Sequence, residues 1–440
     1  MARSRRKSGG GGGANKKLPL NQSIPLGIQH VFAMFAGNIT VPLIVAGVFG
    51  VTTAEKIFLI QMALFAAGVA TIIQTVGYKN IGSRLPIIQG TSFAFIPIML
   101  PFKAFGLGAI FTAAFIGGIF QIWIGKMLKP IRHMFPPLVT GIVVLMIGIS
   151  LLKVGFKYAG GGVWLMNNKP EIFGNWEHLL IAGTVLIVAL VCNLRGKGMV
   201  SAASILIGII AGFVMAALLG EIRWEKIAAA GWFAFPMPFQ YGIDFVWGAV
   251  ILMLFMSIVT TIETIGDISA TTMGGANREA TDKELSGGIM ADGVGTAFAS
   301  IFNAMPNTSY SQNAGLVAFT GVISRHVGTV AGVILILLGL FPKLGGIIAA
   351  MPDSVIGGAA IIMFGLIAGA GIKLISKTEM SQRNILILAL SLSFGIGLYA
   401  FPEFVAHIPD FGIKLKLLLT TGLIPAGLLA FILNATLPKK

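Results

Sequence analysis

Cysteine is almost missing from this sequence: Cys192 is the only one in 440 residues. A single thiol excludes an intramolecular disulfide framework and a cysteine-ligated metal cluster. The five histidines are scattered along the chain, which argues against a histidine metal site. The chain also lacks a glycine-rich phosphate loop followed by lysine, and no nucleophile elbow precedes a helix. We therefore expect no metal, no cofactor and no enzymatic activity.

Charge is also scarce. Charged residues make up 11% of the chain and hydrophobic residues 56%, whereas an average soluble domain carries about 25% charged residues. No single soluble core could bury so much apolar sequence, so the composition predicts an all-α polytopic membrane protein surrounded by lipid. The net charge of +15 comes from basic residues at the N-terminus and between apolar segments. This distribution fits the positive-inside rule, and we expect no nucleic-acid partner.

The termini are predicted to be cytoplasmic. Residues 1–22 form a basic, glycine-rich tail of the kind that is flexible, and the apolar stretch after it is too long for the core of a cleavable signal peptide. Basic residues mark both ends: Arg3, Arg5, Arg6, Lys7, Lys16, Lys17, Lys439 and Lys440. These features predict a multi-pass protein of the cytoplasmic (inner) membrane.

Twelve apolar segments approach the length of about 20 residues that a bilayer-spanning helix needs. They lie near 26–50, 55–77, 105–127, 137–155, 177–194, 201–220, 244–270, 286–304, 325–341, 354–373, 383–400 and 414–434. Two further segments, 87–100 and 311–321, are too short to span. Counting them gives fourteen segments, with the short ones third and tenth. This arrangement predicts two repeats of seven, which are inverted because seven is odd, and short paired segments typically mark a transporter site.

The stretch 306–321 is polar although apolar segments flank it closely. Non-helical backbone at membrane depth persists only where it is buried in protein or lines a cavity, so we expect a binding site here. Gln312 can donate and accept hydrogen bonds at once, which suits a heterocycle with alternating N–H and C=O edges. Tyr310 could stack on a ring or bind through its hydroxyl, and Asn313 could cap a half-helix or brace the site. Two converging half-helix N-termini would favour an anionic or electron-rich substrate.

Glu263 and Asp267 lie four residues apart within one apolar span, on the same helical face. An ionisable residue in a span usually faces the bundle interior and serves function, although a satisfied buried carboxylate, or a span that ends before Asp267, would also fit. One of the pair could bind and release a proton while the other accepts hydrogen bonds from a substrate N–H. His30, in the first span, is either a core histidine with one hydrogen bond or a group in proton coupling.

The first short segment begins with Gln89, Gly90, Thr91, Ser92, Phe93, Ala94 and Phe95. Small and hydroxyl residues allow close backbone approach, and unwound backbone offers free N–H and C=O groups. Phe93 or Phe95 could stack on a flat ring. Helix packing alone is the alternative interpretation of this segment.

With these motifs, the chain resembles the nucleobase–ascorbate transporters, also called xanthine/uracil permeases, over residues 20–434. The family signature is Gln, Glu or Pro, then Asn, any residue, Gly, any four residues, Thr, and Arg, Lys or Gly. It is complete here as Gln312, Asn313, Gly315, Thr320 and Gly321. The segment 89–95, the two carboxylates and the Gln29–His30 pair resemble the family as well.

The resemblance implies a fold and a mechanism. A core domain would comprise residues 23–130 and 241–345 (segments 1–4 and 8–11). A gate domain would comprise residues 131–240 and 346–440 (segments 5–7 and 12–14). Segments 3 and 10 would each carry a short strand and a half-helix with the substrate between them. Relatives are typically homodimers whose core moves like an elevator against the gate.

The resemblance also implies roles for the site residues. Glu263 would bind ring N–H groups, and Gln312 would read the opposite polar edge. Phe93 and Tyr310 would sandwich the ring, with backbone at Ser92 and Ser311 contributing. Two further residues, Asp267 and His30, would support the binding carboxylate and the coupling proton, and Asn313 is counted with the substrate-binding group.

Gln312 decides the substrate class, because uracil-type relatives tend to carry Glu there. The resemblance therefore implies a proton-coupled importer of xanthine, urate or a related oxidised purine. Tyr310 departs from the Phe of several purine relatives, which leaves the choice of purine open. The alternatives are a uracil permease of the same fold, an anion exchanger of the same architecture, and a membrane-embedded enzyme. The acid at Glu263 argues against the anion exchanger, because it would repel the anion.

Overall fold

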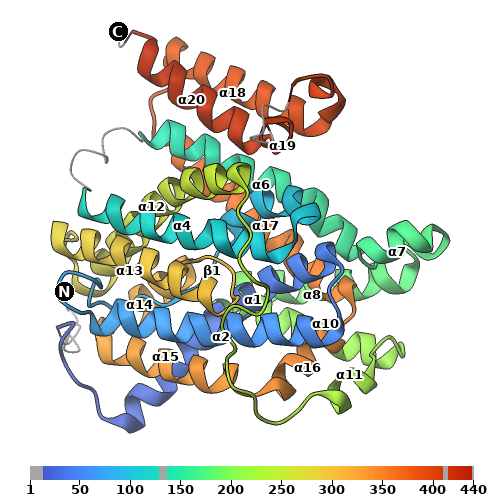
Figure 1. Cartoon of the computed structure of the whole chain (residues 1–440). Helices are drawn as coiled ribbons and strands as arrows, with labels where there is room; N and C mark the ends of the chain where they lie inside the picture. Colours follow the sequence, from blue (N-terminus) through green and yellow to red (C-terminus); the bar gives the residue numbers. More distant parts are fainter. Residues whose placement is uncertain (1–12, 128–135, 410–414, 439–440) are drawn as a thin grey trace, which may run out of the picture.

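The computed structural model of the chain describes residues 13–127, 136–409 and 415–438, which are helical nearly throughout (Figure 1). Four basic residues of the predicted tail (Arg3, Arg5, Arg6 and Lys7) and the last two lysines lie outside the described residues. The sidedness of the termini therefore stays a prediction.

Every predicted full-length segment overlaps a helix, but the predicted helix 414–434 is broken into α19 (Leu415–Thr420) and α20 (Leu423–Thr436). In the first half these are α1 (Leu20–Phe49), α2 (Thr53–Val76), α4 (Gly106–Lys126), α6 (Pro137–Ala159), α8 (Trp176–Arg195) and α10 (Ser204–Leu218). In the second half they are α12 (Trp247–Ala276), α13 (Asp282–Ile301), α15 (Arg325–Gly339), α17 (Asp353–Ile375), α18 (Gln382–Ala400) and α20 (Leu423–Thr436), with the short α19 (Leu415–Thr420) before α20.

The number of membrane spans is only partly established. Among the described residues, eight helices are long and apolar enough to cross a membrane, or nine if the bent pair α15 and α16 (Pro342–Ala350) counts as one span. α10 and α20 are apolar but shorter. The chain is thus a multi-helix membrane protein, while the count of fourteen segments stays a prediction.

The predicted helix 325–341 is present as α15 and ends slightly earlier, at a sharp bend. α15 stops at Gly339, and α16 starts at Pro342 with a bend of 76° between the two. Pro342 lacks the N–H of a helix interior and disfavours helical backbone at the residue before it, and Phe341 is extended there with φ −105° and ψ 94°. Two short helices, α7 (Val163–Asn168) and α11 (Trp224–Ala229), also occur between the predicted full-length segments.

Helix packing in the two halves follows one pattern. In the first half α4 packs on α12 and α13, and in the second half α15 packs on the corresponding helices α1 and α2. α8 pairs with α10 as α18 pairs with α20, and α6 packs lengthwise on α17. The helices of the two halves therefore pack in equivalent ways, as expected for two structural repeats.

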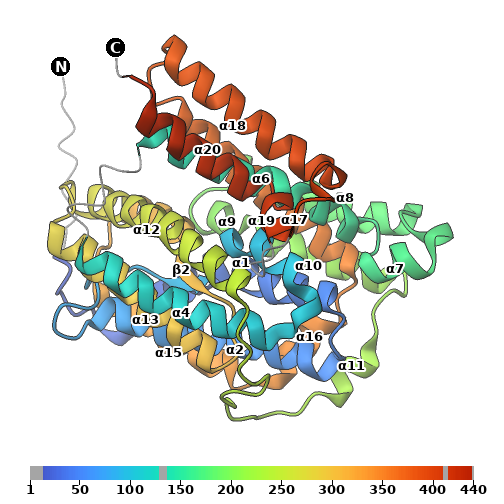
Figure 2. The same cartoon turned by 45° about the horizontal axis from the view of Figure 1, so that its top comes forward.

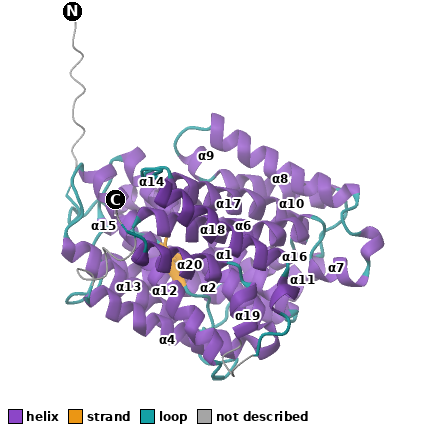
Figure 3. Cartoon of the chain, turned by 90° about the horizontal axis from the view of Figure 1, so that it is seen from above, coloured by secondary structure: helices purple, strands orange, loops and turns teal. Residues whose placement is uncertain are grey.

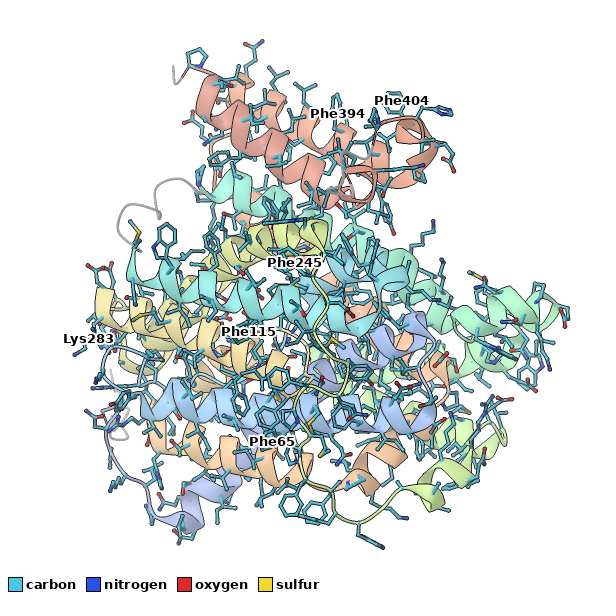
Figure 4. The ribbon with its side chains drawn as sticks, viewed as in Figure 1. Phe65, Phe115, Phe245, Lys283, Phe394 and Phe404 are labelled. Carbon is cyan, nitrogen blue, oxygen red and sulfur yellow. The ribbon has the colours of Figure 1, made fainter. Side chains whose placement is uncertain are left out.

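The pair α18 and α20 forms an outer layer against α6 (Figure 2). Phe394 on α18 and Phe404 in the short turn after it are 53% and 82% exposed, and their side chains lie on the outside of the bundle (Figure 4). Large exposed apolar groups of this kind are typical of surfaces that face lipid or another subunit.

Candidate substrate-binding site

Two short strands meet inside the bundle. β1 (Gln89–Thr91) and β2 (Asn307–Ser309) pair antiparallel, with Gln89 opposite Ser309 and Thr91 opposite Asn307. All six strand residues are buried, and the strands lie enclosed by helices (Figure 3). Backbone hydrogen bonds continue the ladder from Ser92 N to Pro306 O (2.9 Å) and from Tyr310 N to Ile88 O (3.0 Å). Each half of the chain thus contributes one extended segment to the interior of the bundle, and the backbone groups of each segment are satisfied partly by the other.

A short helix follows each strand. After β1, the Ser92 hydroxyl accepts a hydrogen bond from Ala94 N at 3.3 Å and begins the 3-10 turn η1 (Phe93–Phe95). After β2, α14 (Ser311–Thr320) begins at once, with Tyr310 as its N-cap residue. The predicted combination of strand and half-helix is thus present in the second short segment. In the first, the helical stretch is broken into η1, α3 (Ile96–Met99) and η2 (Leu100–Phe105), which leads into α4.

The predicted acid Asp267 holds the start of α14. Its side chain is buried, and its two carboxylate oxygens accept hydrogen bonds from Ser309 Oγ and Ser311 Oγ, each at 2.6 Å. Charge-assisted bonds of this length are strong. Asp267 thus fixes the junction between β2 and α14, where the first free N–H groups of the half-helix lie.

Glu263 lies one helical turn before Asp267 on α12, and its environment is different. Its side chain is exposed, and it forms no hydrogen bond with any described residue. The carboxylates of Asp267 and Asp292 act on it electrostatically, and Glu263 in turn acts on Tyr310. A carboxylate beside α14 with both oxygens available can accept hydrogen bonds from ring N–H groups of a ligand.

Gln312 faces a cavity of about 660 Å³ that separates α1 and α14 from α10 and α17. Tyr310 lines the same cavity, together with Met363 and Leu366 of α17. The Gln312 side chain is exposed and has no hydrogen-bond partner within the described parts of the chain. Its amide is therefore available to pair with a polar edge of a ligand.

The two predicted stacking residues border one backbone position. A β-carbon placed on Gly37 would lie 2.8 Å from Tyr310 Cε1 and 3.4 Å from Phe93 Cε2. Phe93 is half-buried and packs edge-to-face against Phe364 of α17, with ring centroids 5.8 Å apart. Tyr310 is 6% exposed, and its hydroxyl donates to the Thr91 carbonyl at 2.7 Å.

His30 and Asn313 are in direct contact. Asn313 Nδ2 donates to His30 Nδ1 and to the His30 carbonyl, both at 2.9 Å, and both side chains are buried. An Nδ1 that accepts a hydrogen bond leaves Nε2 to carry the proton of the neutral ring. Asn313 therefore braces α14 against α1, while the predicted role of His30 in proton coupling stays a prediction.

The sequence reasoning did not include Asp292, which is completely buried on α13. Its carboxylate accepts hydrogen bonds from Gln89 Nε2 of β1 and Thr264 Oγ1 of α12. The signal was present, because Asp292 is an acid within the apolar stretch 286–304, as Glu263 is within 244–270.

No group of three or more His, Cys, Asp or Glu side chains that could hold a metal ion occurs among the described residues.

Asn38 was also missing from the predicted site. Its Oδ1 accepts from Thr91 N at 2.8 Å, and its carbonyl accepts from Thr91 Oγ1 at 2.7 Å. Strand β1 is thereby fixed to α1 as well as to β2. Gly90 makes this approach possible, since a β-carbon there would lie within 2.8 Å of Met34, Asn38 and Tyr310.

Comparison with known proteins identifies the family and agrees with the fold. The family model Xan_ur_permease, described as a permease family, matches residues 21–404. The xanthine permease XanP of Escherichia coli K12 is 35% identical over 436 residues, covering 96% of this chain and 93% of XanP. The uric acid permease PucJ of Bacillus subtilis is 36% identical over 412 residues, covering 93% of this chain and 91% of PucJ.

Among solved structures, the transmembrane domain of the cyanobacterial bicarbonate transporter BicA matches with a TM-score of 0.59 at 16% identity, covering 96% of this chain and all of that domain. Murine Slc26a9, an anion transporter, matches with a TM-score of 0.59 at 13% identity, covering 92% of this chain and 68% of that one. At these identities the likeness concerns the fold alone. The family match and the relatives at 35–36% identity go further, and the chain belongs to the nucleobase–ascorbate transporters, the xanthine/uracil permease family, which are transporters and not enzymes.

Proposed function

We propose that this protein imports xanthine, urate or a related oxidised purine together with protons. The observation that carries the proposal is the pair Glu263 and Gln312, which are exposed beside the start of α14 and have no partner among the described side chains. A carboxylate and an amide placed in this way match the N–H groups and the alternating polar edge of an oxidised purine. The relatives named as xanthine and uric acid permeases favour the purine over uracil.

The remaining site residues receive supporting roles. Phe93 and Tyr310 border Gly37 and would contact the faces of a flat ring. Backbone at Ser92 and Ser311 would also contribute: Ser311 begins α14, whereas the Ser92 N–H already donates to Pro306 O. Further back, Asp267 and Asn313 would keep the half-helix in position, and His30 would support proton transfer.

The transport cycle is part of the same proposal. Fourteen segments in two inverted repeats would form a core around β1 and β2 and a gate around α6 and α17, and the core would move like an elevator. Both termini would be cytoplasmic, and the protein would be a homodimer in the inner membrane. An external proton and purine would load the core together, and inward exposure would release both.

Replacing Glu263 by Gln tests the site. Loss of one charge-assisted hydrogen bond costs about 1.5–3 kcal/mol, so we expect uptake at low purine concentration to fall roughly ten- to a hundredfold. Labelled xanthine uptake into membrane vesicles, with protein amount measured by immunoblot, gives the readout. Glu171→Gln, the same change at an exposed acid in η4 (Pro170–Ile172), is the matched control.

The same vesicle assay distinguishes proton from sodium coupling, and a purine from uracil as the substrate. Uptake by the unaltered protein should follow an imposed proton gradient, and unlabelled urate should compete better than uracil. Full uptake by Glu263→Gln would disprove the site. Accumulation that follows a sodium gradient would disprove proton coupling.

A further inference from the structure

A second cavity of about 550 Å³ lies at one end of the bundle and shares no residue with the first. It is lined by residues of the turn 77–84 between α2 and β1, by residues of the segment 278–284 before and at the start of α13, by Arg325 at the start of α15, and by Ala14 and Asn15. Figure 4 shows Lys283, which lines it, at the left end of the bundle, opposite the end that carries α7.

The turn 77–84 is held rigidly. Tyr78 and Ile81 exchange two backbone hydrogen bonds of 2.9 Å, Gly82 N donates to Gly287 O at 2.7 Å, and Arg84 N donates to Gln74 O at 3.0 Å. Lys79 and Arg84 both have left-handed backbone, with φ of 51° and 58°. Such backbone is unfavourable for residues other than glycine and persists where the surroundings fix it, commonly at functional sites. The turn thus presents two basic side chains in a fixed arrangement.

Two guanidinium groups at this cavity are oriented by backbone carbonyls. Arg84 Nη2 donates to Lys79 O at 3.1 Å, and Arg325 Nη1 donates to Val76 O at 3.2 Å. Neither arginine forms an ion pair with a carboxylate of the described residues, and each keeps further N–H donors available. Within the described parts of the chain, no carboxylate forms an ion pair with either of these charges.

The acidic side chain at this cavity already forms an ion pair. Glu284 is the one acidic side chain among the described residues that line it, and it pairs with Arg278 through two N–H···O contacts of 2.5 and 2.8 Å. Four basic side chains lining the cavity are left over, namely Lys79, Arg84, Lys283 and Arg325. An excess of this size around one concave site favours an anion.

We propose that this basic cavity, formed by Lys79, Arg84, Lys283 and Arg325, binds a phosphate group. The planar fork of arginine matches phosphate oxygens in pairs, and lysine adds mobile point charge. Basic pockets at the membrane surface between helices bind the phosphate of anionic lipid headgroups, and a free phosphate-bearing solute presents the same chemistry. The N-terminal segment forms part of the rim, since Arg325 N donates to Ala14 O (2.9 Å) and Ser324 Oγ to Lys16 O (2.5 Å). An occupant would therefore touch the tail as well as the helices.

Thermal unfolding of the purified full chain in uncharged detergent tests the proposal. Short-chain phosphatidylglycerol, short-chain phosphatidylcholine and inorganic phosphate are titrated separately. A ligand that binds only the folded protein raises Tm with its concentration, so we expect a saturable rise of a few degrees with phosphatidylglycerol and none with phosphatidylcholine. Arg84→Gln with Arg325→Gln should weaken the apparent affinity at least about tenfold, because two charged hydrogen bonds are lost.

The matched control is Lys373→Gln with Lys377→Gln, which removes two exposed positive charges after and at the end of α17, outside the cavity. Lys283→Gln is the milder variant if the double arginine variant does not fold. A response to inorganic phosphate as well as phosphatidylglycerol supports a free phosphate as occupant, and a response to phosphatidylglycerol alone supports a lipid. Equal loss in the control variant would overturn the proposal in favour of general surface charge, and so would an unaltered protein that responds to neither anion.

Discussion

At the scale of single residues, Tyr310 shows how the site is assembled. Its backbone N–H extends the strand ladder to Ile88, its side chain borders Gly37, and its hydroxyl reaches the carbonyl of Thr91 on the opposite strand. The residue therefore ties the start of α14 to the end of β1 and also presents a ring to the cavity. Phenylalanine at position 310 would keep the aromatic ring but lose the hydrogen bond to the Thr91 carbonyl.

Tyr310→Phe should accordingly weaken substrate binding without preventing folding. The lost hydrogen bond costs about 1 kcal/mol, and the Thr91 carbonyl is left unpaired in a buried place. We expect a several-fold rise in the Kd of xanthine, measured by equilibrium binding to purified protein, and a small fall in Tm. Tyr399→Phe is the matched control, because that hydroxyl also donates to a backbone carbonyl, of Ser150 at 2.7 Å, far along the chain from the site. An equal change in Kd for both variants would show that the tie is not specific to the site.

The sequence indicated which acids matter but not how they differ. Glu263 and Asp267 are visible because a charge inside an apolar run is costly. That Asp267 is bound by two serines while Glu263 is not depends on Ser309 and Ser311, which are more than 40 residues away. Asp292 obeys the same rule as Glu263 and was recognisable, whereas the link from Asn38 to Thr91 depends on a close approach of α1 that no local pattern reports.

At the scale of elements, the start of α13 is the best-defined helix end near the basic cavity. Thr281 and Glu284 form a capping box, in which each side chain bonds the backbone N–H of the other residue. Arg278 adds its paired contacts to the same carboxylate. Although partial burial opposes ionisation, the hydrogen bonds from Arg278 and Thr281 prevail and lower the pKa of the Glu284 carboxyl.

The sign of this shift predicts a pH dependence. A carboxyl whose pKa is lowered by folding stabilises the folded state above its unfolded pKa of about 4.3, and the stabilisation is lost as the pH falls through the folded value. Glu284→Gln should therefore lower Tm at pH 7, and the gap from the unaltered protein should narrow as the pH falls below about 4. Scanning Tm from pH 7 to pH 3 measures it, with Glu171→Gln as the control. A gap that stays constant over that range would contradict the capping role of the charge.

Element lengths were largely predictable and breaks were not. The apolar run 325–341 continues smoothly in composition, so a criterion based on hydropathy extends the helix to the residue before Pro342. The structure ends it at Gly339 and turns by 76° into α16. The polar stretch 306–321 was recognisable as a site because non-helical backbone at membrane depth must be buried or line a cavity, whereas the antiparallel pairing of β1 with β2 was not predicted.

At the scale of the whole molecule, the helices fall into two groups that meet mainly along α1. This helix contacts α10 and α17, and its Ile44 carbonyl accepts a hydrogen bond from the Tyr158 hydroxyl of α6 at 2.8 Å. In the first group α1, α2, α12 and α13 contact the strands, and α4 and α15 pack on these helices. In the second group α6, α8, α10, α17, α18 and α20 pack around one another. Between the groups, near the first turns of α2 and α17, the Lys56 ammonium lies 3.8 Å from the Asp353 carboxylate. The cavity lined by Gln312 lies further along α17, near Met363 and Leu366. It extends to the residues that follow α8, away from the Lys56–Asp353 ion pair. The boundary between the two groups of helices thus has an ion pair near one end and a cavity near the other.

If the two groups move against each other during transport, linking them at the bridged end should stop the cycle. Lys56→Cys with Asp353→Cys, in a Cys192→Ser background that removes the single native thiol, allows a reducible bifunctional thiol reagent to join α2 to α17. We expect xanthine uptake to be lost on cross-linking and restored by a reductant. Thr75→Cys with Thr329→Cys is the control, since those hydroxyls are 3.0 Å apart and join α2 to α15 within one group. The ion pair itself should contribute about 1 kcal/mol or less to stability, so any loss of uptake would come from blocked motion and not from unfolding. Persistent uptake in a fully cross-linked Lys56–Asp353 pair would mean that α2 and α17 do not separate, and the elevator movement of the core would have to be abandoned for a smaller rearrangement around α14.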